Sequence, residues 1–108
     1  MPILSGYRIM WLFAMFDLPV TTSAQRKAAA GFRNNLLNLG FEMVQFSVYT
    51  RHCFSKEIVG ALISKVENLA PKEGKVKVLS ITDKQFENIS HLGENINNPT
   101  IQKQLVLF

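Results

Sequence analysis

Only one cysteine, Cys53, occurs among the 108 residues of the sequence. A single thiol cannot form an internal disulfide, and zinc sites use grouped ligands, so neither a disulfide scaffold nor a zinc module is favoured. Chains without disulfides are typical of reducing compartments. We therefore expect a cytoplasmic protein whose cysteine stays reduced.

Long hydrophobic runs are also absent. The longest apolar segment, Ile9–Phe16, has eight residues, whereas a membrane-spanning helix needs roughly 20. No membrane association is predicted. The segment does stand where a signal peptide would, with Arg8 before it and the small residues Thr22-Ser23-Ala24 after it. Its aromatic side chains, and the helix start that follows, favour a strand over a secretion signal.

Acidic side chains are scarce in the first half of the chain. Residues 1–56 hold two acids against six basic residues, whereas residues 57–108 hold six acids and six lysines. All four arginines lie in the first half. Because the guanidinium group suits phosphate oxygens, a one-sided basic surface predicts binding to a nucleic-acid backbone. A merely solvated basic protein explains the charge equally well.

What the sequence does contain is enough apolar surface for one domain. Hydrophobic residues make up 47% of the chain, which is ordinary for a globular fold. No repeat or linker occurs before residue 93. We expect one ferredoxin-like domain over residues 1–92, with residues 93–108 as a C-terminal loop and edge strand of the same domain.

Local signals predict the order of the elements. The expected segments are a strand over Arg8–Phe16, a helix from Thr22 to Leu39, extended chain over Phe41–Phe54, a helix from Ser55 to Pro71, a strand over Lys75–Ile81, a turn or short helix over Asp83–Ser90 and a terminal strand over Leu105–Phe108. Thr22 and Gln25 have the spacing of a capping box. Gly40 is expected to stop the first helix, and Ser55 is expected to cap the second. The extended chain is one long strand by its pattern, or it reverses near Phe46-Ser47, where no standard turn signal stands.

Each predicted helix carries one apolar stripe, as expected for a helix that covers a sheet. The first stripe is Ala28, Phe32, Leu36 and Leu39, and the second is Ile58, Leu62, Val66 and Leu69, widened by Val59 and Ile63. Together the elements form the split βαβ pattern, which predicts an α+β ferredoxin-like sandwich with an added C-terminal strand.

This architecture leaves one face of the sheet uncovered in a monomer. The first strand is nevertheless apolar on both sides, with Trp11, Phe13 and Met15 pointing away from the helices. A symmetric partner is the simplest cover for such a face. The residues therefore predict a sheet-to-sheet homodimer. The apolar tail residues Leu105, Val106, Leu107 and Phe108 are also expected to dock.

Asp17 follows the apolar strand directly and precedes Leu18-Pro19. A carboxylate at the end of a rigid strand can ligate Mg²⁺, which usually keeps several waters and needs only one or two protein carboxylates. In a two-fold dimer, one aspartate per chain provides two facing carboxylates. The alternative is that Asp17 only begins a turn, and from the residues alone this is the commoner case.

Other candidates are weaker. His52 and Cys53 are neighbours in an extended segment and point to opposite faces, so we interpret them as a surface histidine and a packed cysteine rather than a metal or nucleophile site. His91 receives no role. Tyr49 and Arg51 share a strand parity with Ser47 and Gln45, and this row suits either nucleic-acid contact or a dimer interface.

Three segments together resemble one known family. They are Met15-Phe16-Asp17-Leu18-Pro19, then Gln25-Arg26-Lys27 with Phe32-Arg33, and Gly40-Phe41 followed by Gln45-Phe46-Ser47-Val48-Tyr49-Thr50-Arg51. The chain is similar to the Cas-two (Cas2) family of CRISPR-associated proteins, especially to members from systems with a Cas9-type effector. Val78 to Ile89 adds to the match. The resemblance covers about residues 7–90.

The resemblance implies a ferredoxin-like homodimer with a hairpin in Phe41–Phe54 and a terminal strand that joins the partner's sheet. Asp17 takes the position of the family's magnesium-binding, catalytic aspartate. Family members are described as metal-dependent endonucleases acting on RNA or DNA. Their other role is structural, in spacer acquisition: the dimer bridges two dimers of the Cas-one integrase and holds double-stranded DNA.

The residues favour the structural role. Phosphodiester hydrolysis usually needs two close metals, or a metal and a base, and only Asp17 is in evidence. We expect Arg26, Lys27, Arg33 and Arg51 to contact phosphates in a salt-sensitive, sequence-independent manner. The alternatives are a toxin-like ribonuclease of the same fold and a regulatory module that binds a small molecule between protomers.

Overall fold

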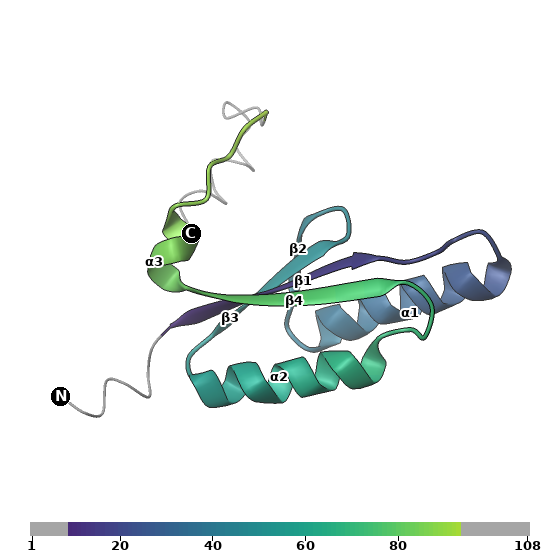
Figure 1. The fold of residues 1–108 in the computed structure, drawn as a ribbon, viewed down its shortest axis with the longest axis horizontal. Helices are drawn as coiled ribbons and strands as arrows, with labels where there is room; N and C mark the ends of the chain where they lie inside the picture. Colours follow the sequence, from purple (N-terminus) through teal and green to yellow (C-terminus); the bar gives the residue numbers. More distant parts are fainter. Residues whose placement is uncertain (1–8, 94–108) are drawn as a thin grey trace.

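The computed structural model describes residues 9–93 (Figure 1). Its elements are β1 (Met10–Asp17), α1 (Ser23–Asn38), β2 (Glu42–Gln45), β3 (Val48–Cys53), α2 (Lys56–Leu69), β4 (Lys75–Thr82) and α3 (Asp83–Glu87). The strands form one antiparallel sheet in the order β2-β3-β1-β4. This arrangement confirms the predicted α+β, ferredoxin-like fold. The predicted terminal strand Leu105–Phe108 lies outside the described residues.

Both long helices begin at the predicted caps. The Thr22 side chain accepts a hydrogen bond from the backbone N–H of Gln25 at 3.1 Å, and Gln25 Oε1 accepts one from the Thr22 N–H at 3.0 Å. The Ser55 side chain caps α2 by accepting one hydrogen bond from the backbone N–H of Ile58 at 3.3 Å. Helix α1 ends at Asn38 with Leu39 as its C-cap, and Gly40 follows with φ of 90°, a backbone conformation that glycine adopts easily.

The extended segment Phe41–Phe54 is a hairpin, which confirms the reversal near Phe46-Ser47 that the residues left open and the family resemblance implied. Strands β2 and β3 pair on either side of Phe46 and Ser47, and Ser47 takes a φ of 63°. Glycine and asparagine are the residues that most often adopt this left-handed conformation in hairpin turns. Because a serine occupies the position here, the sequence carries no standard turn signal. The Ser47 carbonyl accepts a hydrogen bond from the N–H of Phe16 at 3.1 Å, so the turn lies beside the end of β1.

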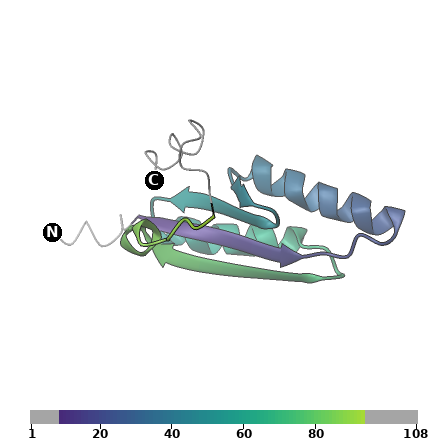
Figure 2. The same cartoon turned by 90° about the horizontal axis from the view of Figure 1, so that it is seen from above.

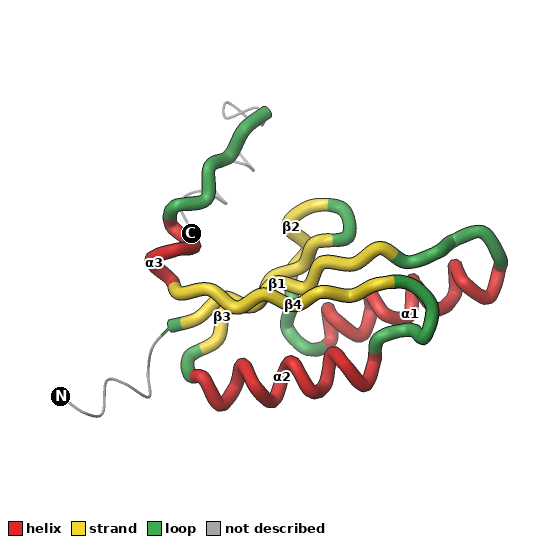
Figure 3. The backbone as a smooth tube through the Cα atoms, in the orientation of Figure 1, coloured by secondary structure: helices red, strands yellow, loops and turns green. Residues whose placement is uncertain are grey.

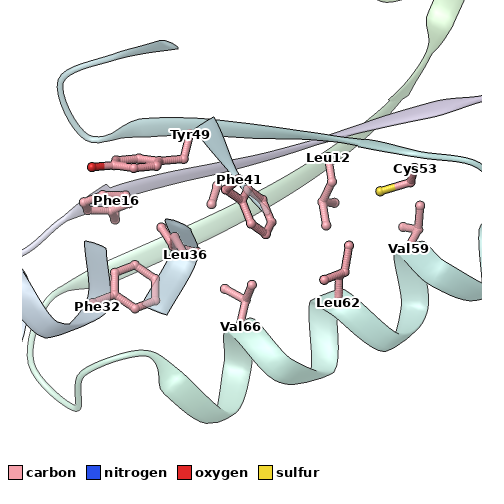
Figure 4. Packing of buried hydrophobic residues seen from close by; sticks show 11 residues of the cluster. Leu12, Phe16, Phe32, Leu36, Phe41, Tyr49, Cys53, Val59, Leu62 and Val66 are labelled. Carbon is pink, nitrogen blue, oxygen red and sulfur yellow. The ribbon is translucent and has the colours of Figure 1, made fainter. Parts of the chain in front are cut away.

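The core lies between the sheet and the two long helices (Figure 4). Its buried members are Leu12, Ala14, Phe16, Phe32, Leu36, Phe41, Tyr49, Cys53, Val59, Leu62 and Val66. The predicted stripe on α1 is right at Phe32 and Leu36 but wrong at Ala28, which is exposed while Ala29 is buried. The stripe runs through Ala29 because apolar positions on a helix repeat at three as well as four residues.

Helices α1 and α2 lie on the same side of the sheet, as Figure 3 shows in red below the yellow strands. Seen from above, the strands lie in front and α2 behind them (Figure 2). The other side of the sheet is called here the open face. Within residues 9–93, none of the helices is long and apolar enough to cross a membrane.

The open face is partly covered by the chain itself. The Phe86 ring, from α3, stacks on the Trp11 ring with centroids 3.8 Å apart and an interplanar angle of 8°. Trp11 Nε1 also donates a hydrogen bond to Asp83 Oδ1 at 2.7 Å. The expectation that a monomer leaves this whole face wet is therefore wrong at the Trp11 end, where α3 packs on the sheet.

Candidate nucleic-acid interface

Asp17 is the last residue of β1 and is exposed to solvent. Leu12, Ala14 and Phe16 are buried toward the helices. Because side chains alternate along a strand, Asp17 belongs to the open face together with Phe13 and Met15. The carboxylate therefore lies on a rigid strand end, as the sequence predicted.

The loop that connects α2 to β4 holds the backbone around Asp17. Gly74 has a φ of 98°, and a Cβ atom at this position would lie 2.7 Å from the Asp17 carbonyl oxygen. The same atom would lie 2.9 Å from Leu18 Cδ2 and 3.0 Å from Pro19 Cδ. Only glycine fits this approach without a shift of backbone, so residue 74 determines how closely the two loops pack.

The strand register adds positive charge beside Asp17. In the antiparallel pair of β1 and β4, Asp17 is opposite Lys75 and Met15 is opposite Lys77. Residues directly opposite in such a pair share one face of the sheet. Sequence reasoning missed both lysines because it counted charge along the chain, where residues 57–108 are balanced. The alternation of Lys75 and Lys77 with Val76 and Val78 was the available signal.

The single carboxylate of Asp17 fits a Mg²⁺ ion that keeps most of its water ligands. Within residues 9–93, no group of three or more histidine, cysteine, aspartate or glutamate side chains is arranged to hold a metal ion. One chain thus offers a single carboxylate, which is compatible with an ion that keeps most of its waters. A tightly caged cation is not compatible with these residues.

The predicted cations of α1 lie beyond the loop that follows Asp17. Arg26 is exposed, and its Nη1 donates hydrogen bonds to the carbonyls of Val20 and Thr21 at 3.2 and 3.1 Å. Lys27 is exposed and Arg33 is half-buried. Part of the Arg26 guanidinium is therefore used to hold the loop between β1 and α1.

Arg51 lies beside Gly40, just after the carboxyl-terminal end of α1. It is opposite Leu12 in the β1–β3 pair, on the side of the sheet that faces the helices. It is half-buried, and a Cβ atom on Gly40 would lie 2.9 Å from its Nε. The structure therefore places Arg51 on the opposite side of the sheet from Asp17.

The row of Gln45, Ser47, Tyr49 and Arg51 does not form a surface. Tyr49 is buried, with its ring 5.6 Å from that of Phe16 (Figure 4). Gln45 is on β2 and Ser47 is in the turn, so the row is divided between two strands. The interpretation of this row as a nucleic-acid contact or dimer interface is therefore wrong. It assumed that alternate residues share one face, which holds only along one continuous strand.

His52 and Cys53 behave as the sequence suggested. Cys53 is fully buried, and burial raises the pKa of its thiol, which Arg51 partly offsets. His52 is half-buried, with its ring 4.7 Å from that of Trp11 and 4.8 Å from that of Phe54. The two side chains point to opposite faces and do not make a joint site.

A shallow groove of about 290 Å³ runs beside the loop after Asp17. Its lining residues are Leu18, Pro19, Thr22, Ala24, Gln25, Ala28, Ala29, Pro71, Lys72 and Glu73. Gln25 Nε2 donates a hydrogen bond to Glu73 Oε2 at 2.8 Å and links α1 to the loop before β4. The groove is mostly apolar, so it does not resemble a phosphate site.

The fold and the site together define an α+β protein of the ferredoxin-like class, with one exposed carboxylate at the end of a central strand. Residues 10–89 match the family described as CRISPR associated protein Cas2. The chain belongs to this family, which confirms the resemblance seen in the sequence.

Similar proteins from several bacteria carry the name CRISPR-associated endoribonuclease Cas2. The relative from Paracidovorax avenae is 57% identical over 84 residues, which cover 78% of each chain. The relative from Parvibaculum lavamentivorans is 46% identical over 101 residues, which cover 92% of this chain and all of the relative. The relative from Flavobacterium psychrophilum is 46% identical over 83 residues, or 77% of this chain and 72% of the relative.

Proposed function

We propose that this chain is an adaptation subunit of a CRISPR system, which acts in the cytoplasm as a homodimer, binds double-stranded DNA and bridges dimers of the Cas-one integrase. The observation that carries the proposal is the open face. It combines an apolar strand at its centre with an exposed carboxylate and lysines at one end. Membership of the Cas2 family supports the same conclusion.

The homodimer follows from the apolar part of the open face. Leu79 is 48% exposed and lies opposite Phe13, while Phe13 and Met15 are half-buried. Covering a large apolar side chain contributes roughly 1.5–3 kcal/mol. Helix α3 covers Trp11 and reaches Phe13, whose ring lies 5.9 Å from that of Phe86, so a second copy remains the simplest cover for Met15 and Leu79.

DNA binding would use the cations of α1 and not Arg51 in the first instance. Arg26, Lys27 and Arg33 lie on a helix that begins just after the Asp17 loop. Contacts from such side chains to phosphates position a duplex without reading its sequence. Arg51 is half-buried on the side of the sheet that the helices cover and would contribute less.

A Mg²⁺ ion would bind at Asp17, with a second carboxylate coming from the other protomer. The ion would neutralise phosphate charge and orient it at the dimer axis. The side chain of Asp17 would hold the ion through its carboxylate oxygens and leave most of its waters in place. Hydrolysis would also need an activated water and a stabilised leaving oxygen. Asp17 alone does not supply both, so endonuclease activity is secondary in this proposal.

A second candidate function is RNA cleavage as the main activity. It is favoured by the names of the relatives, which are called endoribonucleases. In that case Asp17 would be the working residue, and DNA binding would be incidental.

The substitution Asp17→Asn separates the two candidates. We expect spacer uptake, in cells that also carry the integrase and a repeat array, to be reduced but not lost, because the cations of α1 still hold the duplex when no ion is bound at Asp17. Glu67→Gln on α2 is the matched control, since it removes one exposed carboxylate far from the open face. Loss of all cellular effect in Asp17→Asn alone, with both the dimer and its duplex binding intact, would establish the nuclease candidate instead.

Binding to a duplex of ~30 base pairs tests the DNA-binding role directly, because phosphate contacts weaken steeply with salt. We expect gel-shift affinity to fall as salt rises. A chain that does not bind the duplex at any salt concentration would favour the small-molecule alternative.

A further inference from the structure

The open face has two chemically different ends. At one end, Trp11 packs on Phe86 and lies opposite Ile81. At the other end, Asp17 and Lys75 lie opposite each other, and Lys77 is two residues further along β4. Lys75 and Lys77 are both exposed, so the charged end is open to solvent.

The two lysines point the same way. Val76 and Val78 pack against the core on the helix side, and strand side chains alternate, so Lys75 and Lys77 project from the open face. Residues two apart on a strand are separated by about 7 Å. Long, flexible lysine side chains at this spacing can reach neighbouring phosphates of one nucleic-acid strand.

We infer that Lys75, Lys77 and Asp17 form one phosphate-binding site at the charged end of the open face, separate from the cations of α1. The site takes the sugar-phosphate backbone of a nucleic acid. This inference rests on the proposed function and names additional residues that perform it. Lys75 offsets the repulsion between the Asp17 carboxylate and a phosphate, and Lys77 attracts the next phosphate.

A structural role in the monomer does not account for both lysines. An exposed lysine opposite an exposed carboxylate, as Lys75 is opposite Asp17, adds little to stability. The residue opposite Lys77 is Met15, which carries no charge. The other open-face residues of β4 are Leu79 and Ile81, which are apolar. The two lysines are therefore better suited to contact a charged partner than to pack against an apolar surface.

The charged end also stays accessible when two copies pair. Burial of unpaired ammonium groups is costly. A second copy would therefore cover the apolar part of the open face and leave Lys75 and Lys77 at the margin. A nucleic acid can then reach the lysines of both copies.

The test compares two variants that lose the same charge. Lys75→Gln with Lys77→Gln removes the site, whereas Lys56→Gln with Lys65→Gln removes two exposed lysines from α2, behind the sheet. Affinity for a labelled duplex is measured by fluorescence anisotropy across a salt series with EDTA. The slope of log affinity against log salt should fall by about two for each protomer that contacts the duplex.

The α2 variant should retain nearly all of the wild-type slope. Equal losses in the two variants would mean that net charge alone matters and would overturn the inference. A third variant, Arg26→Gln with Lys27→Gln, separates the inference from the proposed function. If the Arg26/Lys27 variant loses duplex binding while the Lys75/Lys77 variant retains it, the inference is overturned but the proposed function is not. A wild-type chain that does not bind nucleic acid overturns both.

A separate measurement tests whether Asp17 belongs to the same phosphate-binding site. In EDTA, Asp17→Asn should tighten duplex binding by roughly twofold to fivefold, because it removes a negative charge close to a phosphate. Mg²⁺ should abolish this difference. Glu67→Gln is the control and should not tighten binding. Unchanged binding in Asp17→Asn would show that the carboxylate is not beside the bound phosphate and would overturn its assignment to the site.

Discussion

The carbonyl oxygen of Asp17 lies 2.7 Å from the place where a side chain on residue 74 would begin. Gly74 therefore allows the loop before β4 to pack against the end of β1. The backbone at the carboxyl end of β1 depends in this way on a glycine far away in the sequence.

Replacing Gly74 by alanine should disturb this contact. The φ of 98° and the close oxygen both oppose a Cβ atom, so we expect Gly74→Ala to lower the free energy of unfolding by about 1–3 kcal/mol. Urea denaturation measures the change. Gly60→Ala on α2 is the control, since nothing lies within 4 Å of its Cβ position. It should raise the free energy by about 0.5–1 kcal/mol.

The hydrogen bond from Trp11 to Asp83 should be visible by fluorescence, because Trp11 is the only tryptophan in the chain. We expect Asp83→Ala to shift the Trp11 emission to longer wavelength. It should also lower the free energy of unfolding by about 1–3 kcal/mol, the usual cost of losing a partly buried bond to a carboxylate.

Glu87→Ala, at the exposed end of α3, is the control for this experiment. It should leave the emission maximum unchanged. Identical spectra for wild type and Asp83→Ala would show that α3 does not hold Trp11 in solution.

The buried thiol of Cys53 makes stability depend on alkaline pH. Burial raises its pKa, so the folded chain holds this proton more tightly than the unfolded chain does. The corresponding stability is present below the unfolded pKa of about 8.5 and is lost as pH rises toward the folded pKa. We expect the free energy of unfolding to decline from about pH 8.5 upward.

Cys53→Ala should remove this part of the decline. Denaturation curves from pH 7 to 10 give the comparison. Iodoacetamide should also modify the native wild type far more slowly than the unfolded chain, because the thiol is buried. Parallel pH profiles for wild type and Cys53→Ala would contradict the prediction.

The proposed homodimer depends on the exposed apolar residues of the open face. Leu79→Lys should convert the dimer to a 12.2 kDa monomer in sedimentation experiments. Leu37→Lys is closely matched, since Leu37 is 50% exposed and Leu79 is 48% exposed, but Leu37 lies on α1, behind the sheet. It should leave the dimer intact. A wild-type chain that already sediments as a monomer would refute the proposed dimer.

Features that depend on near neighbours in the chain were predictable. The capping box of Thr22 and Gln25, the cap at Ser55 and the stop at Gly40 all occur as expected. Each involves hydrogen bonds or backbone angles within a few residues. Asp17 was found for the same reason, since a polar residue directly after an apolar strand marks the end of that strand.

Features that depend on pairing between distant segments were not predictable. The hairpin at Ser47 has no glycine signal, so the residues left one long strand and a reversal near Phe46-Ser47 both open, and only the family resemblance implied the hairpin. The row that included Tyr49 assumed a continuous strand, and Tyr49 is buried instead. Helix α3 was expected as a turn or short helix, but nothing in its pattern showed that Phe86 would cover Trp11.

The sequence by itself determined the elements, their caps and the two-sided apolar strand that ends at Asp17, because these depend on local backbone preferences and on side-chain alternation. Only the tertiary structure decided that Lys75 lies opposite Asp17 and that Gly74 packs against its carbonyl. Register between β1 and β4 is the physical reason, since it is determined by which residues of two distant strands pair and not by either strand alone.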